Sequence, residues 1–335
     1  MKSLVTGGAG FIGSHVVDCL IEWGDEVVVL DDLSGGFPEN VPKGATLVPG
    51  SVTDHELVDT LFRKYHFDFV YHLAAYAAEG LSHFIRRFNY QNNLIGSVNL
   101  INAAVTHSVR RFVFMSSIAV YGDATPPFTE GMTPTPIDPY GISKWAVEQD
   151  LEAAHKVFGL DYTIFRTHNV YGERQNIGDP YRNVIGIFMN KILKEEPLPI
   201  FGTGGQLRAF TYVGDIAPVV AGCVHREKAA NEAFNLGSDE RNTVNFMASR
   251  VIRYMIGNRV RYPFERFDER HEAFEAYCDH AKAKLLLDAP CATKLDDGLE
   301  RMANWVRRQG PREGKPFSGI EVERNLPPSW RKVVA

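Results

Sequence analysis

The sequence predicts an α/β protein in which the first half of the chain forms a doubly wound parallel sheet and the second half forms a smaller α/β lobe. Two observations predict the sheet. A short apolar run, residues 3–6, leads into three glycines spaced three apart, and apolar residues at helical spacing follow them. Strand-like apolar runs then alternate with amphipathic stretches as far as residue 166. This alternation is typical of right-handed βαβ units, in which helices cover both faces of a parallel sheet. We therefore expect a Rossmann-type fold.

The elements of the first half follow one another in a regular order. After the opening strand and a helix at 14–21, we expect strands at 26–30, 45–49, 69–73, 111–116 and 162–166. Helices are expected at 54–65, from the small-residue loop at 74–80 to about residue 107, and at 140–158. Together these elements place one doubly wound domain at residues 1–168.

The second half is less regular. Helices are expected at 185–193, 215–225, 243–256 and 295–309, with Trp305 on the apolar side of the last one, and a Gly/Pro loop at 197–205. A strand at 233–236 is short enough to join the first sheet, so a return segment near 210–240 is predicted. The remainder of 169–335 forms the smaller lobe. The polar, proline-rich tail from Gly310 is expected to wrap the surface or fray.

Composition excludes several classes of partner. Charged residues of both signs are mixed, and the net charge of −5 leaves no basic stripe for nucleic acid. No apolar run approaches the length of a membrane span, and the first residues form a core strand instead of a signal peptide. The four cysteines are scattered without a CxxC pair, which indicates reduced thiols in a cytoplasmic protein. The eleven histidines show no metal-ligand spacing, so no metal is expected.

The glycine turn predicts a site for an anionic cofactor. Gly7 permits a strained turn, Gly10 lets the backbone approach a pyrophosphate, and Gly13 lets the helix pack closely on the strand. The free N–H groups at the start of the helix point toward such an anion, and the helix dipole supports binding. A glycine pattern of this kind is weak evidence alone, and its position between a strand and a helix strengthens it.

Asp31 favours NAD over NADP as the cofactor. It ends the second strand, eighteen residues beyond Gly13, where a ribose-binding acid is expected. A carboxylate there accepts a hydrogen bond from a free ribose 2′-OH and repels a 2′-phosphate. The alternative is that Asp31 and Asp32 only begin a solvated turn into residues 34–36.

Three residues in the middle of the chain can carry redox chemistry on an alcohol. Ser117 follows the fifth strand, and Tyr140 and Lys144 lie four residues apart on one face of the next helix. We expect Lys144 and a positive nicotinamide ring to lower the pKa of Tyr140 toward neutrality, so that the phenolate takes a proton while the alcohol C–H gives hydride to NAD⁺. Ser117 would bind the same oxygen. Each motif alone is more often structural.

The chain resembles the extended short-chain dehydrogenase/reductase family, and within it the nucleotide-sugar epimerases and dehydratases such as UDP-glucose 4-epimerases. The resemblance covers nearly the whole length. It lies in TGGAGFIGSH at 6–15, DDLSGG at 31–36, HLAA at 72–75, NNLIGS at 92–97, SSIAVYG at 116–122, PYGISK at 139–144, RTHNVYG at 166–172 and GQLRAFTYVGDIA at 205–217.

This resemblance implies roles for individual residues. Ser117, Tyr140 and Lys144 match catalytic positions. The NAD site implied is Gly7, Gly10, Phe11, Ile12, Gly13, Asp31, Asp32, Ser34, Val52, Leu73, Ala74 and Ala75, with Tyr140 and Lys144. The substrate site implied is Ser82, Asn93, Asn169, Phe201, Arg208, Arg270 and Ala276. Within it, Asn169, Arg208 and Arg270 match positions that hold the diphosphate, and Asn93 matches an asparagine that shapes the site. A homodimer through the helices near 90–107 and 141–158 is also implied.

The loops distinguish the reactions of this family. Related 4,6-dehydratases carry an acidic pair directly after the catalytic Ser/Thr, where this chain has Ile118 and Ala119, and 3,5-epimerases resembling it carry a cysteine at the Ala119 position. The expected reaction is therefore 4-epimerisation of an NDP-sugar through a transient 4-keto sugar. A UDP-hexose or UDP-N-acetylhexosamine is the expected substrate, since the small Ala276 matches a gatekeeper position, although the loop could also align one residue away.

Glu79 keeps two other functions open. It stands in the loop expected to face the sugar, near Ser82 and His83, where typical 4-epimerases have no acid. If Glu79 points inward, it and His83 could act as acid and base at C3 or C5, and the enzyme would be a dehydratase or a 3,5-epimerase. If it points outward, it is an exposed carboxylate at a helix start. A non-catalytic NAD-binding scaffold is the remaining alternative.

Overall fold

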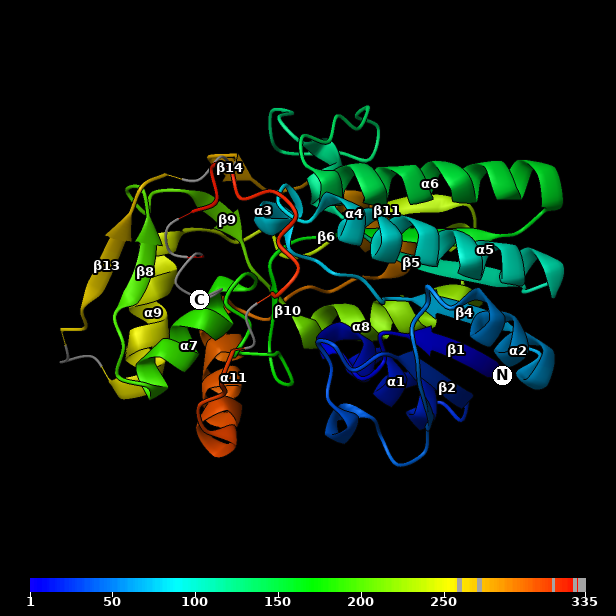
Figure 1. Ribbon diagram of the computed structural model, residues 1–335, viewed down its shortest axis with the longest axis horizontal. Helices are drawn as coiled ribbons and strands as arrows, with labels where there is room; N and C mark the ends of the chain where they lie inside the picture. Colours follow the sequence, from blue (N-terminus) through cyan, green and yellow to red (C-terminus); the bar gives the residue numbers. More distant parts are fainter. Residues whose placement is uncertain (258–260, 270–272, 315–316, 328–329, 331–335) are drawn as a thin grey trace.

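The computed structural model describes residues 1–257, 261–269, 273–314, 317–327 and 330, and its centre is a seven-stranded parallel sheet (Figure 1). The strand order is β3-β2-β1-β4-β5-β6-β11. The strands are β1 (Lys2–Thr6), β2 (Glu26–Asp31), β3 (Thr46–Pro49), β4 (Phe69–His72), β5 (Arg111–Ser117), β6 (Tyr162–Thr167) and β11 (Glu232–Leu236). The order reverses direction between β1 and β4, which is the switch point at which open α/β sheets bind ligands. The predicted doubly wound fold is confirmed.

Helices cover both faces of this sheet. Side chains alternate along each strand, so Leu4 and Val28 pack into one core while their neighbours Val5 and Val29 pack into the other. The first core is covered by α2 (His55–Tyr65), α5 (Gly96–Thr106) and α6 (Pro139–Phe158). The second is covered by α1 (Phe11–Glu22) and α8 (Val213–Gly222), which pack on each other. The return segment therefore supplies both α8 and the edge strand β11.

The helix expected to run from the 74–80 loop to residue 107 is divided into several pieces. They are α3 (Glu79–Ser82), α4 (Arg86–Tyr90), a π-helical turn at Gln91–Ile95, and α5. The break falls at Ile85, where the backbone leaves the helical conformation (φ −135°, ψ 42°) and the side chain is fully buried. The burial of Ile85 outweighs helical continuity, so α3 stands apart beside the sheet edge.

The smaller lobe lies beside the carboxyl ends of the strands (Figure 1). Its helices are α7 (Val184–Leu193), α9 (Val244–Ile256), α10 (Ala281–Leu287) and α11 (Leu295–Gln309), and short 3₁₀ turns at Cys223–His225 and Glu227–Ala229 follow α8. Its short strands are β7 (Val170–Tyr171), β8 (Leu198–Phe201), β9 (Leu207–Ala209), β10 (Thr211–Tyr212), β12 (Arg241–Thr243), β13 (Phe264–Phe267) and β14 (Glu275–Ala276). The helices predicted at 185–193, 243–256 and 295–309 are confirmed within one residue.

The loop expected at 197–205 is wrong in its first half. Residues 198–201 form β8, which pairs in parallel with β13. Leu198 and Ile200 are buried, whereas Pro199 and Phe201 are only partly covered. This two-residue period marks a strand, but it spans only four residues between turn-forming neighbours, and its partner is more than sixty residues away.

The tail beyond α11 packs on the surface of the protein, which is one of the two outcomes expected for it. Phe317, Ile320, Leu326 and Trp330 join an apolar cluster formed with the segment around α3 and α4.

Within the described ranges, no helix combines the length and the hydropathy of a membrane-crossing segment.

Candidate active site

A cavity of about 510 Å³ opens at the switch point between β1 and β4 and extends toward the smaller lobe. Its walls come from the glycine turn after β1, the ends of β2, β4, β5 and β6, the start of α6, and the segments around 179–183, 208 and 273–276. This size is typical of a site for a cofactor or small molecule. The cavity brings together residues that are up to 269 positions apart in the chain.

The glycine turn forms one end of the cavity. Gly7 has φ +72°, which a side chain would strain, and a Cβ on Gly13 would lie 2.1 Å from the Gly7 carbonyl oxygen. Helix α1 begins at Phe11 with no side chain capping its N-terminus, so its first N–H groups remain available to an anion. A pyrophosphate of a dinucleotide fits this cradle, because the glycines let it approach the backbone and the start of α1 offers N–H donors.

Asp31 lies at the same end of the cavity. Its Oδ2 accepts a hydrogen bond from Ala9 N at 3.0 Å, and its Oδ1 accepts one from Leu33 N at 2.8 Å. Burial raises the pKa of this carboxyl, while the two backbone donors lower it. The two backbone donors thus hold the carboxylate at the cavity wall. Every other residue expected at the NAD site also lines this cavity, namely Asp32, Ser34, Val52, Leu73, Ala74 and Ala75.

Ser117, Tyr140 and Lys144 meet on the middle of the wall. Tyr140 and Lys144 occupy the first two turns of α6, whose N-terminus is capped by Asp138 through its bond from Gly141 N at 2.9 Å. The Ser117 and Tyr140 side chains are hydrogen bonded to each other. Lys144 Nζ donates to the Met115 carbonyl oxygen at 2.7 Å and lies 5.7 Å from the centre of the Tyr140 ring. The three functional groups therefore come together, but the ammonium is held mainly by β5.

The pKa of Tyr140 shifts in the direction opposite to the one we expected. Burial raises it above its ordinary value, and the nearby Glu79 carboxylate raises it further, whereas the bond with Ser117 lowers it. Burial also lowers the pKa of Lys144 to about 7, although Glu148 opposes this. The chain's own groups therefore do not favour the phenolate form of Tyr140 at neutral pH, because the lysine expected to stabilise that form is itself desolvated and bonded to a carbonyl.

Glu79 and His83 line the cavity on the side of α3. The backbone carbonyl of Glu79 accepts a hydrogen bond from Ser82 Oγ at 2.6 Å, and the residue remains exposed at the first turn of α3. Ser82 itself does not line the cavity. Its side chain is buried, and its second partner is Asp138 Oδ1 at 3.4 Å. Ser82 therefore supports α3 and the start of α6 instead of facing a ligand.

Asn93 also lies behind the wall. Its Oδ1 accepts from Tyr76 N at 2.8 Å, and its Nδ2 donates to the Tyr76 carbonyl oxygen at 3.1 Å and to Asn89 Oδ1 at 2.8 Å. The side chain is buried. It therefore shapes the site by holding the loop after β4, which agrees with the shaping part of the role implied by the resemblance.

The resemblance implies three residues that hold the diphosphate, and two of them line the cavity. Asn169 and Arg208 line the cavity, with Asn169 Nδ2 bonded to the Ala209 carbonyl oxygen at 3.1 Å. The Arg208 guanidinium donates to the backbone carbonyl oxygens of Phe274 and Ala273 at 2.9 and 2.6 Å. In this structure it thus holds the segment that carries Ala276, which also lines the cavity.

Two other residues expected at the substrate site are Phe201 and Arg270. Phe201 does not line the cavity, because its ring stacks on Phe267 at 5.2 Å between centroids across the β8–β13 pair. The sequence showed an aromatic beside a glycine turn but not this partner. Arg270 lies outside the described residues.

An ion pair between Arg182 and Asp179, which the sequence analysis missed, forms part of the cavity wall. Arg182 Nε donates to Asp179 Oδ2 at 2.7 Å, its guanidinium lies 4.9 Å from the centre of the Tyr76 ring, and its charge acts on Tyr140. Tyr181 lines the cavity beside it. The segment before α7 carries no motif that we associated with a function, so only its polar residues before an apolar helix could have indicated a wall.

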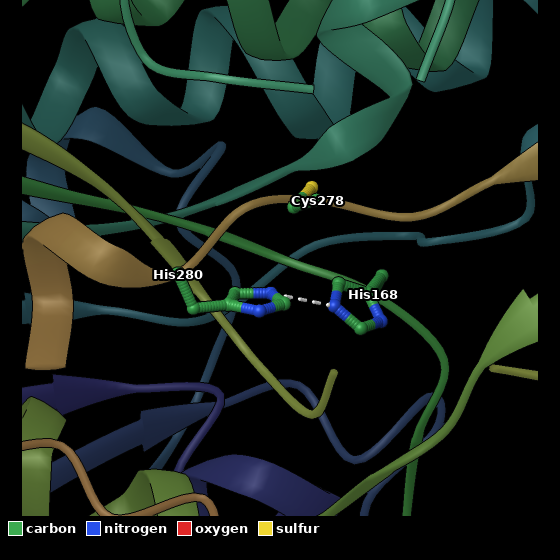
Figure 2. Close-up of side chains that lie close together, drawn as sticks. All are labelled: His168, Cys278 and His280. Carbon is green, nitrogen blue, oxygen red and sulfur yellow. Dashed lines mark hydrogen bonds between the residues drawn. The ribbon is translucent and has the colours of Figure 1, made fainter. Parts of the chain in front are cut away.

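A histidine pair lies near the same cavity. His168, Cys278 and His280 have their nitrogen and sulfur atoms within 4.8 Å of one another (Figure 2). The two Nε2 atoms are 3.0 Å apart, and the Nδ1 atoms face the Ala209 carbonyl and the Asp239 carboxylate at 3.0 and 2.7 Å. Burial lowers the pKa of His168 to about 3. Since both Nδ1 atoms face acceptors, a hydrogen bond between the Nε2 atoms requires one doubly protonated ring, and burial disfavours that charge because it lowers the pKa of both histidines.

A Rossmann-type sheet with a glycine turn and a serine, tyrosine and lysine on one cavity defines the extended short-chain dehydrogenase/reductase class. The family model of the NAD dependent epimerase/dehydratase family matches residues 3–237, so the chain belongs to that family of enzymes. The resemblance inferred from the motifs is thereby confirmed.

Individual relatives match over almost the whole chain. A putative UDP-glucose 4-epimerase of Methanocaldococcus jannaschii is 35% identical over 308 residues, which cover 91% of this chain and 98% of the relative. A UDP-N-acetyl-alpha-D-glucosaminuronate decarboxylase of Bacillus cytotoxicus is 30% identical, covering 91% and 98%. The crystal structure of UDP-glucose 4-epimerase from Thermotoga maritima with UDP-glucose superposes with a TM-score of 0.86 at 35% identity, covering 92% and 99%.

Proposed function

We propose that this chain is an NAD-dependent 4-epimerase of a UDP-linked sugar. The observation that carries the proposal is that Ser117, Tyr140 and Lys144 share one cavity with the glycine turn and Asp31. The relatives named above are consistent with it, since one is a UDP-glucose 4-epimerase and another is named a putative one. Residues 1–168 with the return segment would hold NAD, and the smaller lobe would hold the nucleotide sugar.

The chain's residues would act on the sugar 4-OH. Ser117 Oγ and Tyr140 Oη would both bind the O4 atom, and Tyr140 would take its proton. When bound, NAD would take the hydride from C4 and return it, and its positive ring would supply the charge that Tyr140 lacks. The 4-keto sugar would then rotate in the cavity, so that the hydride returns to its other face. Tyr140 would return the proton to O4 and complete the inversion. Protons and electrons balance, because the proton leaves and returns at O4 and the hydride leaves and returns at C4.

Ile118 and Ala119 favour 4-epimerisation over elimination. Both line the cavity directly after Ser117, and neither can transfer a proton. The competing proposal, a dehydratase or 3,5-epimerase, rests on Glu79 and His83, which also line the cavity. The decarboxylase among the relatives shows that this family also supports chemistry beyond C4. A non-catalytic scaffold would have no use for the three residues on the NAD side.

Assembly and location belong to the same proposal. We infer a homodimer through the helices near 90–107 and 141–158, because Ile142, Val157 and Phe158 are exposed apolar side chains on α6. Leu151, which could also have faced a partner, is fully buried against the sheet. The four cysteines have free thiols, which supports a reducing cytoplasm.

Solvent isotope labelling tests the reaction. Purified protein would be incubated in D₂O with UDP-glucose, UDP-N-acetylglucosamine, UDP-glucuronate or GDP-mannose, and the products followed by NMR. We expect inversion at C4 without deuterium in the sugar. Deuterium at C3 or C5, or an unsaturated product, would transfer the assignment to the Glu79 reaction.

A tyrosine substitution tests the mechanism. Tyr140→Phe should abolish turnover and keep bound NAD, while Tyr65→Phe, outside the cavity, serves as the matched control. Unchanged turnover in Tyr140→Phe would contradict the proposed base.

A further inference from the structure

The C-terminal segment packs behind the wall of the cavity. After α11 the chain returns past α3 and α4, where Figure 1 shows it in red. We call residues 317–327 and 330 the C-terminal strap. Its Phe317, Leu326 and Trp330 pack against side chains from the loop after β4 and from the segment before α7. Both of those segments carry residues that line the cavity.

Aromatic contacts fix the two ends of the strap. The Phe317 ring lies 4.8 Å from Phe88 and 5.3 Å from Tyr76, centroid to centroid. The Trp330 ring lies 6.0 Å from Phe84 and 5.6 Å from Tyr181. Phe88, Tyr76 and Tyr181 line the cavity, so the strap packs directly behind its wall. Trp330 also approaches Gly80, where an added Cβ would lie 3.3 Å from the indole.

Glu321 anchors the middle of the strap. Its two carboxylate oxygens accept hydrogen bonds from Arg87 N and Phe88 N, each at 2.8 Å. The Glu321 backbone N–H donates to the Phe84 carbonyl oxygen at 2.8 Å. The carboxylate thus satisfies the free N–H groups at the start of α4, where a negative charge is favourable. No other residue in the described part of the chain accepts from these two N–H groups as a side chain.

Helix α4 connects this anchor to the catalytic tyrosine. Asn89 Nδ2 donates to the carbonyl oxygen of Pro139, the residue before Tyr140, at 2.9 Å. The Asn89 Oδ1 accepts from Asn93, which holds the backbone of Tyr76. The strap, α4 and the first turn of α6 therefore form one continuous set of contacts around the sugar side of the cavity.

We propose that the C-terminal strap is a positioning element that fixes the sugar-side wall, with Glu321 as its positioning residue. It acts through α3, α4 and Tyr181, and it sets the affinity for the substrate; this step rests on the proposed function.

Hydrogen exchange tests the positioning directly. In Glu321→Ala we expect amide exchange across residues 79–90 to accelerate by about tenfold, because two charge-assisted bonds are lost. Glu321→Gln keeps one oxygen acceptor and should recover part of the protection. Glu323→Ala removes an exposed carboxylate two residues away and is the matched control. Exchange in β1, β2 and β3 should be unchanged in all three variants.

Kinetics then test the link to substrate. In Glu321→Ala, KM for the sugar nucleotide should rise by about tenfold, with kcat changed less than twofold and NAD retained. A chain ending at residue 314 should show the same selective effect, larger in size. Normal exchange at 79–90 in both variants, or loosening of the whole sheet, would overturn the strap proposal. Faster exchange with an unchanged KM would contradict the proposed effect of the strap on substrate affinity. If the unmodified protein converts none of the sugars, the proposed function is wrong. The hydrogen-exchange experiment still tests whether the strap positions the wall.

Discussion

Replacing Lys144 by methionine should stabilise the protein while it removes the lysine that we propose acts beside Tyr140. Lys144 is 3% exposed, and burial lowers its pKa to about 7 from an ordinary value of 10.5. A difference of this size means that folding with a charged Lys144 costs about 5 kcal/mol below pH 7. Methionine has a similar length and no charge, so it avoids this cost.

The cost depends on pH with a definite sign. Because the folded pKa lies below the unfolded one, the unfolded chain binds more protons between pH 7 and 10.5, and the stability of the unmodified protein rises with pH in that window. The penalty is fully present below pH 7 and disappears above 10.5. The stabilisation by Lys144→Met should therefore be about 3 kcal/mol larger at pH 6 than at pH 9.

One opposing effect is independent of pH. The Met115 carbonyl oxygen loses its 2.7 Å hydrogen bond from Lys144, which costs about 1–3 kcal/mol. The net gain at pH 6 is then about 2–4 kcal/mol.

Urea unfolding of NAD-free protein at pH 6 and pH 9 measures both values. Lys228→Met, at an exposed lysine, provides the control and should show no such pH dependence. An equal effect of Lys144→Met at both pH values, or a loss of stability at pH 6, would refute the reasoning from burial. Turnover should be lost in the stabilised variant, since the cation beside Tyr140 is gone.

Three further predictions concern the proposed NAD site and a buried ion pair between α6 and β6. Gly13→Ala should abolish NAD retention, because its Cβ would lie 2.1 Å from the Gly7 oxygen; NAD released on denaturation measures this, and a full complement of NAD would contradict it. Glu148→Ala should lower the free energy of unfolding by about 3–5 kcal/mol, because it leaves the buried Arg166 unpaired; a loss below 1 kcal/mol in urea unfolding would show that water solvates that arginine. Asp31→Asn should reduce the preference for NAD over NADP by about tenfold in calorimetric titrations, since it removes the charge that repels a 2′-phosphate; an unchanged ratio would place the ribose elsewhere.

Local patterns were sufficient to predict the sheet and the NAD side of the cavity. The glycine turn, Asp31 at the end of β2, and Tyr140 and Lys144 one helical turn apart all depend on residues close together in the sequence. The carboxyl ends of parallel strands necessarily meet at one edge, so these residues had to converge once the strand order was assumed. The strand expected at 233–236 was assigned to the first sheet because it is short, and β11 lies at the edge of that sheet.

Tertiary structure alone decided what surrounds these residues. The partner of Lys144 is a carbonyl on β5, and burial lowers the pKa of the lysine, which helical spacing could not indicate. Arg182 joins the wall although its segment has no motif, and Glu321 caps a helix more than 230 residues earlier in the chain. Burial and long-range hydrogen bonds arise from the packing of distant segments, whereas a sequence pattern reports only the period and chemistry of neighbours.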